Sequence, residues 1–582
     1  MPQVEPKAIQ NLVSKLPSRP TLFNQRSLWS LICIAAIAWS LAQTGLFRQD
    51  VINPAGWSLF LRFLVASLHP DLSPELLSLT LDATLVTLAF AICGTALSVL
   101  LGLIGGVLAS QVWWQSVFLT RTGKILPSNY KVPWLSIRAF LSIPRAVHEM
   151  IWGLFFINIF GLDPLVAILA ITIPFGAITA KVFSEILDET PRQPLTALLG
   201  SGVSPLKAFI YSLIPQAFPY LLSYTFYRFE CSIRSAAVLG IIGAGGLGYQ
   251  ILLSLQSLRY EQMWTFFLAL FLLNSSVDFW SALLRRRLGS PSRLDLNLLK
   301  LNRRKRQLSY HGDPIVLASI IGAVGLLLFS FWTLKTDYTK LWAPRTVQLL
   351  AEFVQGIFPP NIHQTQLSEL FDLSTQTIAM SILAIASASL GGMLLSFPAA
   401  HNFLLPGGIL NPISKSKAQW FWGTVTLLLT RSLLLISRAI PAPIWALILL
   451  FMLFPGILPG AIALGLHNLG ILGRLMAEVI ENLDERPSRS LQALGATGAQ
   501  VFLYGVLPTT LPRFMAYTLY RWEVCMRETV IVGLVGAGGL GRLLTEQLSS
   551  FDYKSLVTTL LCFMVITFIV DLLSASARRS LR

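Results

Sequence analysis

The sequence predicts an all-α membrane protein made of two similar halves, and three observations support this fold class. Of the 582 residues, 54% are hydrophobic and only 12% are charged, whereas a soluble domain usually carries roughly a quarter charged residues. Apolar runs long enough to cross a bilayer recur along the chain. A segment of the first half also returns in the second half. We therefore expect about six membrane helices in each half and about twelve in total.

The expected membrane helices follow the apolar runs in order. The first run comes after a polar stretch of about 27 residues, which is too long for a typical signal-peptide start, so we expect an uncleaved first helix. The clearest runs are Leu28–Leu46, Ala83–Ser110, Leu165–Ile186, Ser235–Leu255, Trp264–Leu284, Ile315–Leu334, Thr377–Phe397, Trp445–Phe454 continuing to Leu469, and Val557–Leu573.

The net charge of +16 comes from basic residues gathered at the start, middle and end of the chain. Such clusters mark the cytoplasmic side of a membrane protein. We therefore expect all three in the cytoplasm, which requires an even number of membrane helices in each half. The sequence contains no basic motif interleaved with aromatic residues, so we expect no nucleic-acid partner. The clusters are Lys7, Lys15, Arg19 and Arg26; Arg285–Arg287 with Arg303–Arg306; and Arg578, Arg579 and Arg582.

The internal repeat is detected without gaps when residues 183–248 are aligned with residues 476–541 at one offset, 508 − 215 = 293. From Tyr224 to Gly248 and from Tyr517 to Gly541, 13 of 25 positions are identical. Two copies with the same orientation are related by an axis along the membrane normal, so a pore on that axis is the natural geometry. We expect a first domain at 1–284, a cytoplasmic linker at 285–314 and a second domain at 315–582.

A polar helix, a turn and a second helix are expected in each copy, at Glu185–Pro215 and Glu478–Pro508. In both, a glycine that permits the turn precedes by thirteen positions a proline that suits the first turn of a membrane helix. An ordinary amphipathic cytoplasmic loop is the alternative interpretation for either copy alone. The matched spacing of two copies favours a functional loop.

Charged side chains recur within an apolar helix of each copy, where a charge costs several kcal/mol. Two interpretations remain open. The charges neutralise one another, since Glu230 and Arg234 are four residues apart on one helix face, or the arginines line a path for an anion. We expect Glu230 to pair with Arg234, which would leave Arg228 free to face Arg521 across the pore. The candidate pathway residues are Arg228, Glu230, Arg234, Arg521, Glu523 and Arg527.

Each copy also carries a Gly-Ala-Gly-Gly-Leu-Gly segment, which formally matches a dinucleotide-binding fingerprint but lacks the strand and soluble domain that such a site needs. In a bilayer, clustered glycines allow close helix packing or a break that lines a cavity. The candidate gate or packing residues are Gly243, Gly245, Gly246, Gly248, Gly536, Gly538, Gly539 and Gly541.

The sequence gives no sign of covalent chemistry. There is no phosphate-binding GxxxxGK[S/T] loop, so any ATPase motor would be a separate polypeptide. The six histidines and five cysteines show no metal-ligand spacing. We expect no catalytic residue, no metal and no cofactor.

The two polar loops resemble the coupling loop of bacterial ATP-binding-cassette importer permeases, which docks into a groove of the ATPase subunit. The segments YRFECSIRS and YRWEVCMRE, each followed by GxxGAGGLG, resemble phosphonate and phosphite importer permeases. At the glutamate position of the coupling motif this chain has Thr196 and Arg489, although nearby acids (Asp188, Glu189, Glu481, Asp484, Glu485) could supply negative charge. By this resemblance, the coupling residues are Ala197, Leu198, Gly202, Pro215, Leu491, Gly495 and Pro508.

The resemblance implies a tandem duplicated type I importer domain in the bacterial cytoplasmic (inner) membrane. It implies the permease for a phosphonate or related phosphorus oxyanion, acting by alternating access with two cytoplasmic ATPase subunits and an extracytoplasmic solute-binding protein. It also places the glycine segments near the outer end of the fifth helix, where a gate is expected. The alternatives are an ion-gradient-driven secondary transporter and an importer for another small anion such as phosphate.

Overall fold

The fold is known from a computed structural model that describes residues 25–44, 53–118, 127–287, 314–357, 364–405, 407–410 and 417–581. The described residues form helices and their connections and contain no β-strand. The all-α prediction is therefore confirmed for this part of the chain. Of the middle basic cluster, Arg285–Arg287 belong to a helix, whereas Arg303–Arg306 lie outside the described residues. Lys7, Lys15 and Arg19 of the first cluster also lie outside them.

The helices of the first half alternate between long membrane helices and short ones. They are α2 (Gln25–Gln43), α3 (Pro54–Ala66), α4 (Pro74–Ala109), α5 (Gln111–Val117), α6 (Pro127–Ala146), α7 (Glu149–Phe160), α8 (Pro164–Glu189), α9 (Gln193–Gly200), α10 (Pro205–Ala208), α11 (Ile214–Leu239), α12 (Gly246–Gln256) and α13 (Tyr260–Arg287).

The second half repeats this order. Its helices are α14 (Pro314–Leu334), α15 (Pro344–Ile357), α16 (Gln364–Ala399), α17 (His401–Leu404), α18 (Lys417–Ala439), α19 (Ala442–Met452), α20 (Ile457–Glu481), α21 (Arg486–Ala493), α22 (Gly498–Gln500), α23 (Leu507–Val532), α24 (Gly539–Ser549) and α25 (Tyr553–Leu581).

The two series correspond helix for helix, from α2 and α14 to α13 and α25. The starts of α7 and α19 differ by 442 − 149 = 293 residues, and those of α13 and α25 by 553 − 260 = 293. The offset found in the sequence therefore extends well beyond residues 183–248. The duplication covers both halves.

Eight described helices are long and apolar enough to cross a membrane, and three bent helix pairs bring the number to eleven. The shorter α2 is the repeat partner of the spanning helix α14, so counting it gives six helices per half, as expected. Two of the expected apolar runs are not single continuous helices. Ser235–Leu255 and Trp445–Leu469 each contain a break, because Gly240–Gly245 ends α11 and a Pro-Gly pair at 455–456 separates α19 from α20.

The core of each half is a close pair of helices, α4 with α8 and α16 with α20. Small residues permit this contact: a methyl group on Gly102 would lie 2.5 Å from Cγ2 of Thr179, and one on Gly465 would lie 2.6 Å from Oγ of Ser387. Buried apolar side chains surround both pairs.

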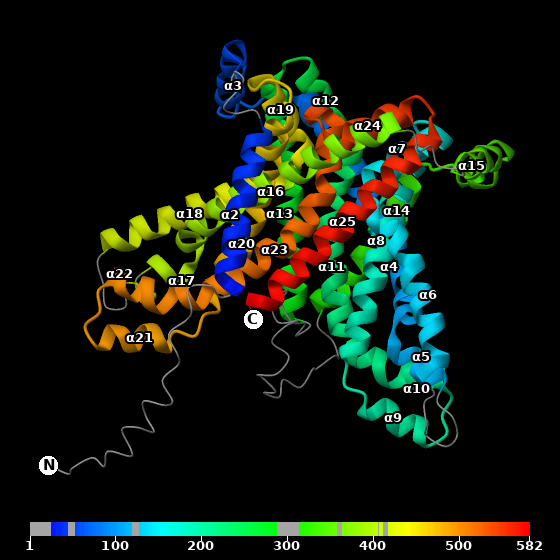
Figure 1. Ribbon diagram of the computed structural model, residues 1–582, viewed down its shortest axis with the longest axis horizontal. Helices are drawn as coiled ribbons and strands as arrows, with labels where there is room; N and C mark the ends of the chain where they lie inside the picture. The colour runs from blue at the N-terminus through cyan, green and yellow to red at the C-terminus, as the bar shows by residue number, and fades with distance from the viewer. Residues whose placement is uncertain are drawn as a thin grey trace.

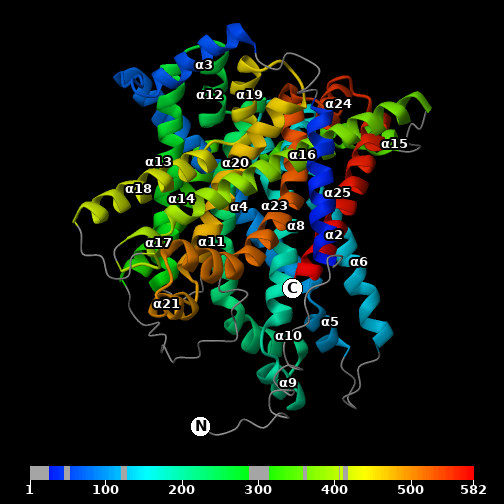
Figure 2. The ribbon, with the colours of Figure 1, turned by 60° about the vertical axis from the view of Figure 1, so that its left-hand side comes forward.

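The first helix of each half packs on the other half. Helix α2 contacts α16, and α14 contacts α4; in Figure 2, α2 lies beside helices of the second half. The expected domain limits, 1–284 and 315–582, thus describe the order of the chain rather than two separately packed bodies. The expected linker at 285–314 lies almost wholly outside the described residues, between the end of α13 and the start of α14.

The short helices define the two ends of the molecule. Figure 1 shows α9 and α21 at the lower side, and α3, α12, α19 and α24 at the upper side. The bundle of membrane helices lies between them. The coupling-type loops of both halves therefore point to the same side, as a direct repeat with an even number of helices requires.

Candidate functional site

Arg228 lies on α11 in the centre of the first half and is 6% exposed. Its Cζ atom lies 3.8 Å from the centre of the Phe175 ring on α8, an arrangement that stabilises a buried cation. Its Nε and Nη2 atoms are buried without a hydrogen-bond partner among the described residues. Its place on a substrate path stays a prediction. Two N–H donors in a buried position can bind an oxyanion.

Arg521, the repeat partner of Arg228, has a different environment. The position of Phe175 is taken by Asn468, since 175 + 293 = 468, and Arg521 donates from Nε to Oδ1 of Asn468 over 2.8 Å. Its Nη2 also lies 3.1 Å from Oε1 of Glu528. Arg521 is thus neutralised within its own half, so the two central arginines are not equivalent.

The direct contacts of Glu230 are with α13 rather than with Arg234, to which it is coupled only electrostatically. Glu230 accepts a hydrogen bond from Oγ of Ser281 over 2.8 Å and lies 3.6 Å from Nη2 of Arg285, both on α13. The α13 partners are in reach because α11 and α13 pack together. Arg234 instead donates to Sγ of Cys231 over 3.3 Å.

The second half repeats the contact between these helices. Arg578 lies 2.5 Å from Oε1 of Glu523 and also donates to Oγ of Ser574. Glu230 and Glu523 therefore fasten the fifth and sixth membrane helices of each half together, which gives them a structural role. Arg527, the partner of Arg234, donates from Nε to the main-chain oxygen of Glu523 over 3.3 Å.

A buried carboxylate that the sequence analysis did not single out lies near these arginines. Glu149, at the start of α7, accepts a hydrogen bond from Oγ of Ser235 over 2.6 Å and lies 3.0 Å from Nδ1 of His148. It interacts electrostatically with Arg228. The sequence offered one signal, an acid directly before an apolar run, but its neighbours come from distant helices.

Apolar side chains beside the central groups join the two halves. Met150, Val238 and Ile531 form an apolar cluster shared by both halves. Met150 directly follows Glu149, and Ile531 lies one helical turn beyond Glu528, so the buried polar groups of each half lie beside this apolar contact.

The glycine segments form sharp breaks between helices. Gly243 and Gly536 have φ angles of 96° and 108°, which favour glycine strongly. A methyl group on Gly248 would lie 1.7 Å from the oxygen of Ala237, so only glycine lets α12 fold back on α11. The N–H of Leu247 donates to Oγ1 of Thr87 over 2.8 Å. These contacts demonstrate a packing function, and the gate stays a prediction.

The remaining glycines of the two segments follow the same pattern. Gly245, Gly246, Gly538 and Gly539 all have positive φ angles. In the second copy, the N–H of Leu540 donates to Oγ1 of Thr377 over 2.9 Å, which repeats the contact of Leu247. A methyl group on Gly541 would lie 2.2 Å from the oxygen of Val530.

The coupling-type loops have the expected helix, turn and helix. Thr196 and Ala197 are exposed on α9, with Leu198 half-buried; Leu491 lies half-buried on α21. Gly202 and Gly495 have φ angles of 84° and 86°, so the turn needs glycine. Pro215 and Pro508 are the second residues of α11 and α23, in the first turn as expected. A π-helical turn precedes each of these helices.

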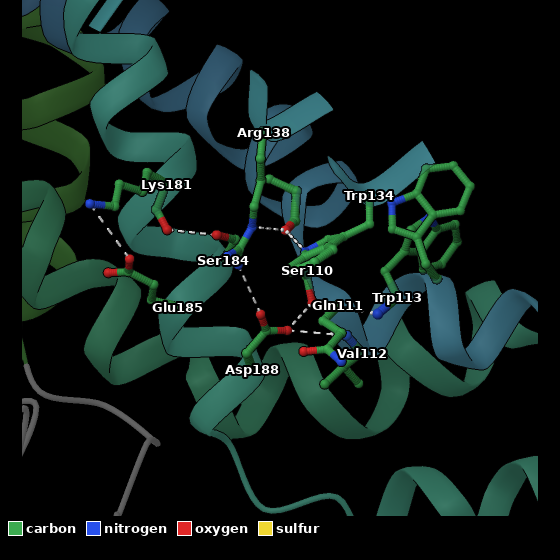
Figure 3. Close-up of polar contacts among 12 residues, drawn as sticks. Ser110, Gln111, Val112, Trp113, Trp134, Arg138, Lys181, Ser184, Glu185 and Asp188 are labelled. Carbon is green, nitrogen blue, oxygen red and sulfur yellow. Dashed lines mark hydrogen bonds and ion pairs between the residues drawn. The ribbon is translucent and has the colours of Figure 1, made fainter. Parts of the chain in front are cut away.

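A charged contact holds the end of α8 next to the coupling helix. Oδ1 of Asp188 accepts hydrogen bonds from Oγ of Ser110 (2.7 Å) and the N–H of Val112 (3.1 Å), and Oδ2 lies 3.2 Å from Nη2 of Arg138 (Figure 3). Arg138 also donates from Nε to the oxygen of Ala109 over 3.1 Å. We call this contact the Asp188 clamp; it joins α4, α6 and α8.

The second half has the same clamp. Arg431 binds Glu481, which also accepts from the N–H of His401 over 3.2 Å, and Arg431 donates from Nε to the oxygen of Ala399 over 2.9 Å. Two of the acids expected to supply charge at the coupling loops, Asp188 and Glu481, are therefore already engaged within the protein.

The other acids near the coupling loops differ in their contacts. Glu485 pairs with Arg489 over 2.7 Å and Asp484 lies 3.6 Å from Arg486. Glu189 is exposed. Within the described residues, no group of three His, Cys, Asp or Glu side chains could hold a metal ion.

These features define a multi-pass membrane permease made from two copies of one domain, each with a coupling-type loop on the same side. The sequence profile of the binding-protein-dependent transport system inner membrane component matches residues 130–290 and 421–582, so the chain belongs to that family. It is a multi-pass protein of the inner membrane with a tandem duplicated ATP-binding-cassette importer domain.

Three similar proteins cover between 37% and 76% of this chain. The phosphate-import permease protein PhnE of Mycolicibacterium smegmatis is 26% identical over 445 residues, 76% of this chain and 77% of the relative. The phosphite transport system permease protein PtxC of Stutzerimonas stutzeri is 34% identical over 266 residues, 45% of this chain and 88% of the relative. A solved chain of the inward-facing MetNI methionine ABC transporter has a TM-score of 0.32 and 22% identity, covering 37% of this chain and 98% of its own length.

Proposed function

We propose that this chain is the permease of an ATP-binding-cassette importer that carries a phosphonate or a related phosphorus oxyanion across the cytoplasmic membrane by alternating access. The observation that carries the proposal is Arg228, a buried arginine with two N–H donors that have no partner among the described residues. A guanidinium matches the geometry of a phosphorus oxyanion, to which it can donate two parallel hydrogen bonds. The names of the relatives, phosphate import and phosphite transport, agree with this substrate class.

The proposed partners are two cytoplasmic ATPase subunits and an extracytoplasmic solute-binding protein. Each half presents one coupling helix, α9 or α21, on the same side of the molecule (Figure 1). The sequence contains no phosphate-binding loop for ATP. Hydrolysis is therefore assigned to the separate subunits, and the chain itself moves the anion without covalent chemistry. The family's dependence on a binding protein favours delivery from outside.

Phosphate is the second candidate within the same class, because one relative is named for phosphate import. The donors of Arg228 would suit phosphate, phosphite and phosphonate alike, since all three present anionic oxygens. A panel of these anions in a reconstituted uptake assay therefore distinguishes them. An ion-gradient-driven carrier would take up the anion without an ATPase, whereas this proposal requires hydrolysis by the co-purifying subunits.

The direct test replaces Arg228 in the assembled transporter. A hydrogen bond to a charged group contributes about 1.5–3 kcal/mol, and about 1.4 kcal/mol is tenfold in binding. We expect Arg228→Gln to reduce uptake of phosphite, phosphonate or phosphate at least roughly tenfold, and Arg228→Lys to keep part of it through charge alone. ATP hydrolysis should continue in both variants.

The matched control is Arg513→Gln, which changes an exposed arginine on α23. Uptake by this variant should equal that of the unaltered protein. Unchanged uptake by Arg228→Gln would contradict the proposed role of Arg228. Failure of that variant to insert or to assemble with the ATPase would make Arg228 a structural residue and would also contradict it.

A further inference from the structure

Two short helices, α3 and α15, lie outside the set of membrane-spanning helices. Each follows the first membrane helix of its half, and with 13 and 14 residues each is too short to cross a bilayer, which takes roughly 20 residues. Both lie at the end of the molecule opposite to the coupling helices α9 and α21, and α15 projects from the bundle there (Figures 1 and 2). Each helix keeps exposed sides that the described residues do not cover.

Equivalent ring contacts place α3 and α15 at the same level of the molecule. The Phe63 ring on α3 lies 5.0 Å from the Trp264 ring and 6.0 Å from that of Tyr260, the first residue of α13. In the second half, the Phe353 ring on α15 lies 5.4 Å from that of Tyr553, the first residue of α25. These two tyrosines are repeat partners at the offset of 293. Both short helices therefore lie where the sixth membrane helix of their half begins.

Helix α15 has three different sides, each a stripe of residues spaced i, i+3 and i+7. The first stripe packs on the protein: Oγ1 of Thr346 donates to the oxygen of Lys340 over 2.7 Å, and the Phe353 ring lies 4.6 Å from that of Phe155 on α7. The second stripe is polar and exposed, and the third is apolar and exposed. At about 100° per residue, the two exposed stripes lie about 160° apart, on opposite sides of the helix. The stripes are Thr346, Leu349 and Phe353; Arg345, Gln348 and Glu352; and Val347, Leu350 and Val354.

Helix α3 has the same division of its surface. Phe63 and Ala66 are buried against the protein. Arg62 is exposed, and because it precedes Leu64 by two residues, it lies on the opposite side of the helix from that exposed leucine. Three of the four exposed apolar residues are spaced i, i+4 and i+7. The four are Trp57, Leu61, Leu64 and Val65.

Lipid is the partner that fits these apolar stripes. Helix α14, the membrane helix directly before α15, is almost wholly exposed along its apolar length, as expected of a helix surrounded by lipid. Apolar exposure continues from there to α15 through Trp332 and Trp342, and tryptophan is enriched at the boundary between lipid and water. A helix with an apolar side and an opposite polar side lies flat in this boundary, with its apolar side among the lipid chains.

We propose that α3 and α15 are interfacial helices that bind the bilayer surface opposite to the coupling helices, with their apolar stripes inserted among the lipid chains. Each of them also holds a short helix of the other half. The N–H of Asn53, directly before α3, donates to the oxygen of Met452 at the end of α19 over 3.1 Å, and Phe353 of α15 contacts Phe155 of α7. The lipid surface therefore helps to position α7 and α19, whichever anion the protein carries.

The test measures which solvent surrounds each side of α15. Spin labels are attached to Val354→Cys and Gln348→Cys of the full chain in phosphatidylcholine vesicles, with the exposed Cys33 replaced by serine and the signal of that parent protein subtracted. Oxygen concentrates in lipid, whereas a nickel chelate stays in water. We expect the ratio of oxygen to nickel collision rates to be severalfold higher at 354 than at 348. A label at Val324→Cys, exposed in the middle of α14, marks the ratio for the lipid interior.

Equal ratios at 354 and 348 would overturn the proposal, because both sides of α15 would then lie in water. Exclusion of both reagents from 354 would also overturn it, because protein rather than lipid would then cover the apolar stripe. Leu64→Cys and Arg62→Cys give the same comparison on α3, should a variant of α15 fail to fold. None of these outcomes depends on anion uptake, so they leave the proposed function untouched.

A second measurement separates apolar insertion from attachment through charge. The label is placed at Leu350→Cys, within the apolar stripe. The further changes Val347→Ser/Val354→Ser should lower the ratio at 350 severalfold, because the stripe then loses most of its apolar surface. The matched control Arg345→Ser/Glu352→Ser removes the charges of the polar stripe and should leave the ratio unchanged. A ratio that stays high in the first variant, or falls in the control, would contradict insertion through the apolar stripe.

Discussion

Arg228 and Arg521 occupy the same position of the repeat but differ in every polar contact. Phe175 faces the first, whereas Asn468 and Glu528 bind the second. A buried cation that is paired has its charge compensated within the protein, whereas a cation with open donors is available to a ligand. The duplicated halves have therefore diverged around the residue that would contact an anion. One of the substitutions that separate them lies on the facing helices, Phe175 on α8 against Asn468 on α20, and another lies on the arginine helices themselves, Ser235 on α11 against Glu528 on α23.

The first prediction concerns the stability of the second half. Arg521→Gln would leave Glu528 buried without its cation, and breaking a buried ion pair costs about 3–5 kcal/mol. We expect a clear fall in the thermal unfolding temperature of the purified protein. The double variant Arg521→Gln/Glu528→Gln should recover most of it, because no charge is then left unmatched. A single variant as stable as the unaltered protein would show that this ion pair does not hold the half together.

The second prediction concerns the close contact of α11 and α12. Gly248→Ala would place a methyl group 1.7 Å from the oxygen of Ala237, and a backbone contact of this kind cannot be relieved by rotating a side chain. We expect loss of the folded transporter, measured by size-exclusion chromatography in detergent. Gly325→Ala on α14 is the control, because nothing lies within 4 Å of the added methyl group. Normal assembly of Gly248→Ala would contradict the tight packing.

Helices connect the coupling loops to the membrane core through the two repeated clamps. Asp188 and Glu481 end α8 and α20, directly before α9 and α21, and each binds the end of a neighbouring long helix and an arginine of α6 or α18. Movement of a coupling helix would therefore be passed to three membrane helices at once. The clamp is a positioning contact, since both of its carboxylates bind groups of this chain.

The third prediction follows from the clamp. Asp188→Asn removes the negative charge of the acceptor and so weakens the hydrogen bonds that Asp188 accepts. A hydrogen bond to a charged group contributes about 1.5–3 kcal/mol. We expect ATP hydrolysis to continue while the amount of anion moved per ATP falls, as measured by uptake and phosphate release in the same proteoliposomes. The exposed neighbour Glu189→Gln is the control and should keep the normal ratio. Equal ratios in both variants would argue against transmission through Asp188.

At the scale of the whole molecule, the exchanged first helices join the halves. Helix α2 lies against α16, and α14 lies against α4 (Figures 1 and 2). Contacts in both directions add to the ion pair between Asp278 and Arg438. A fused chain keeps these contacts at a high local concentration, so the two halves function as one unit.

The fourth prediction tests this association. A protease site placed within residues 288–313 of the full chain should allow cleavage between the halves, and we expect both fragments to migrate together in mild detergent because α2 and α14 each remain on the opposite half. The uncleaved chain marks the position of the complex. Separation of the fragments without added denaturant would contradict the exchanged packing.

The fifth prediction concerns orientation. Because basic clusters mark the cytoplasmic side, we expect the middle and the end of the chain there. A cysteine at Ser292, outside the described residues, should not react with an impermeant reagent applied to intact cells. Ser73→Cys, exposed before α4 at the opposite end from α9, should react. The reverse pattern would invert the topology and exclude a cytoplasmic position for the coupling helices.

The sequence by itself determined the membrane class, the duplication and the position of both coupling-type loops, because apolar length, the constant offset and the glycine spacing are properties of the linear chain. It also indicated Arg228, since a charge in an apolar helix stands out. It could not assign partners. Glu230 pairs across to Arg285 rather than along its helix, and two expected runs ended at glycine or proline breaks.

Only the tertiary structure decided which buried charges are paired with another side chain and which keep hydrogen-bond donors without a partner. Asn468 is distant in sequence from Arg521, and Asp278 is 160 residues from Arg438, yet both pairs are in contact. The physical reason is that the energy of a buried charge depends on the side chains that surround it in space. Repeat partners with the same residue type therefore acquire different properties when the facing helix differs.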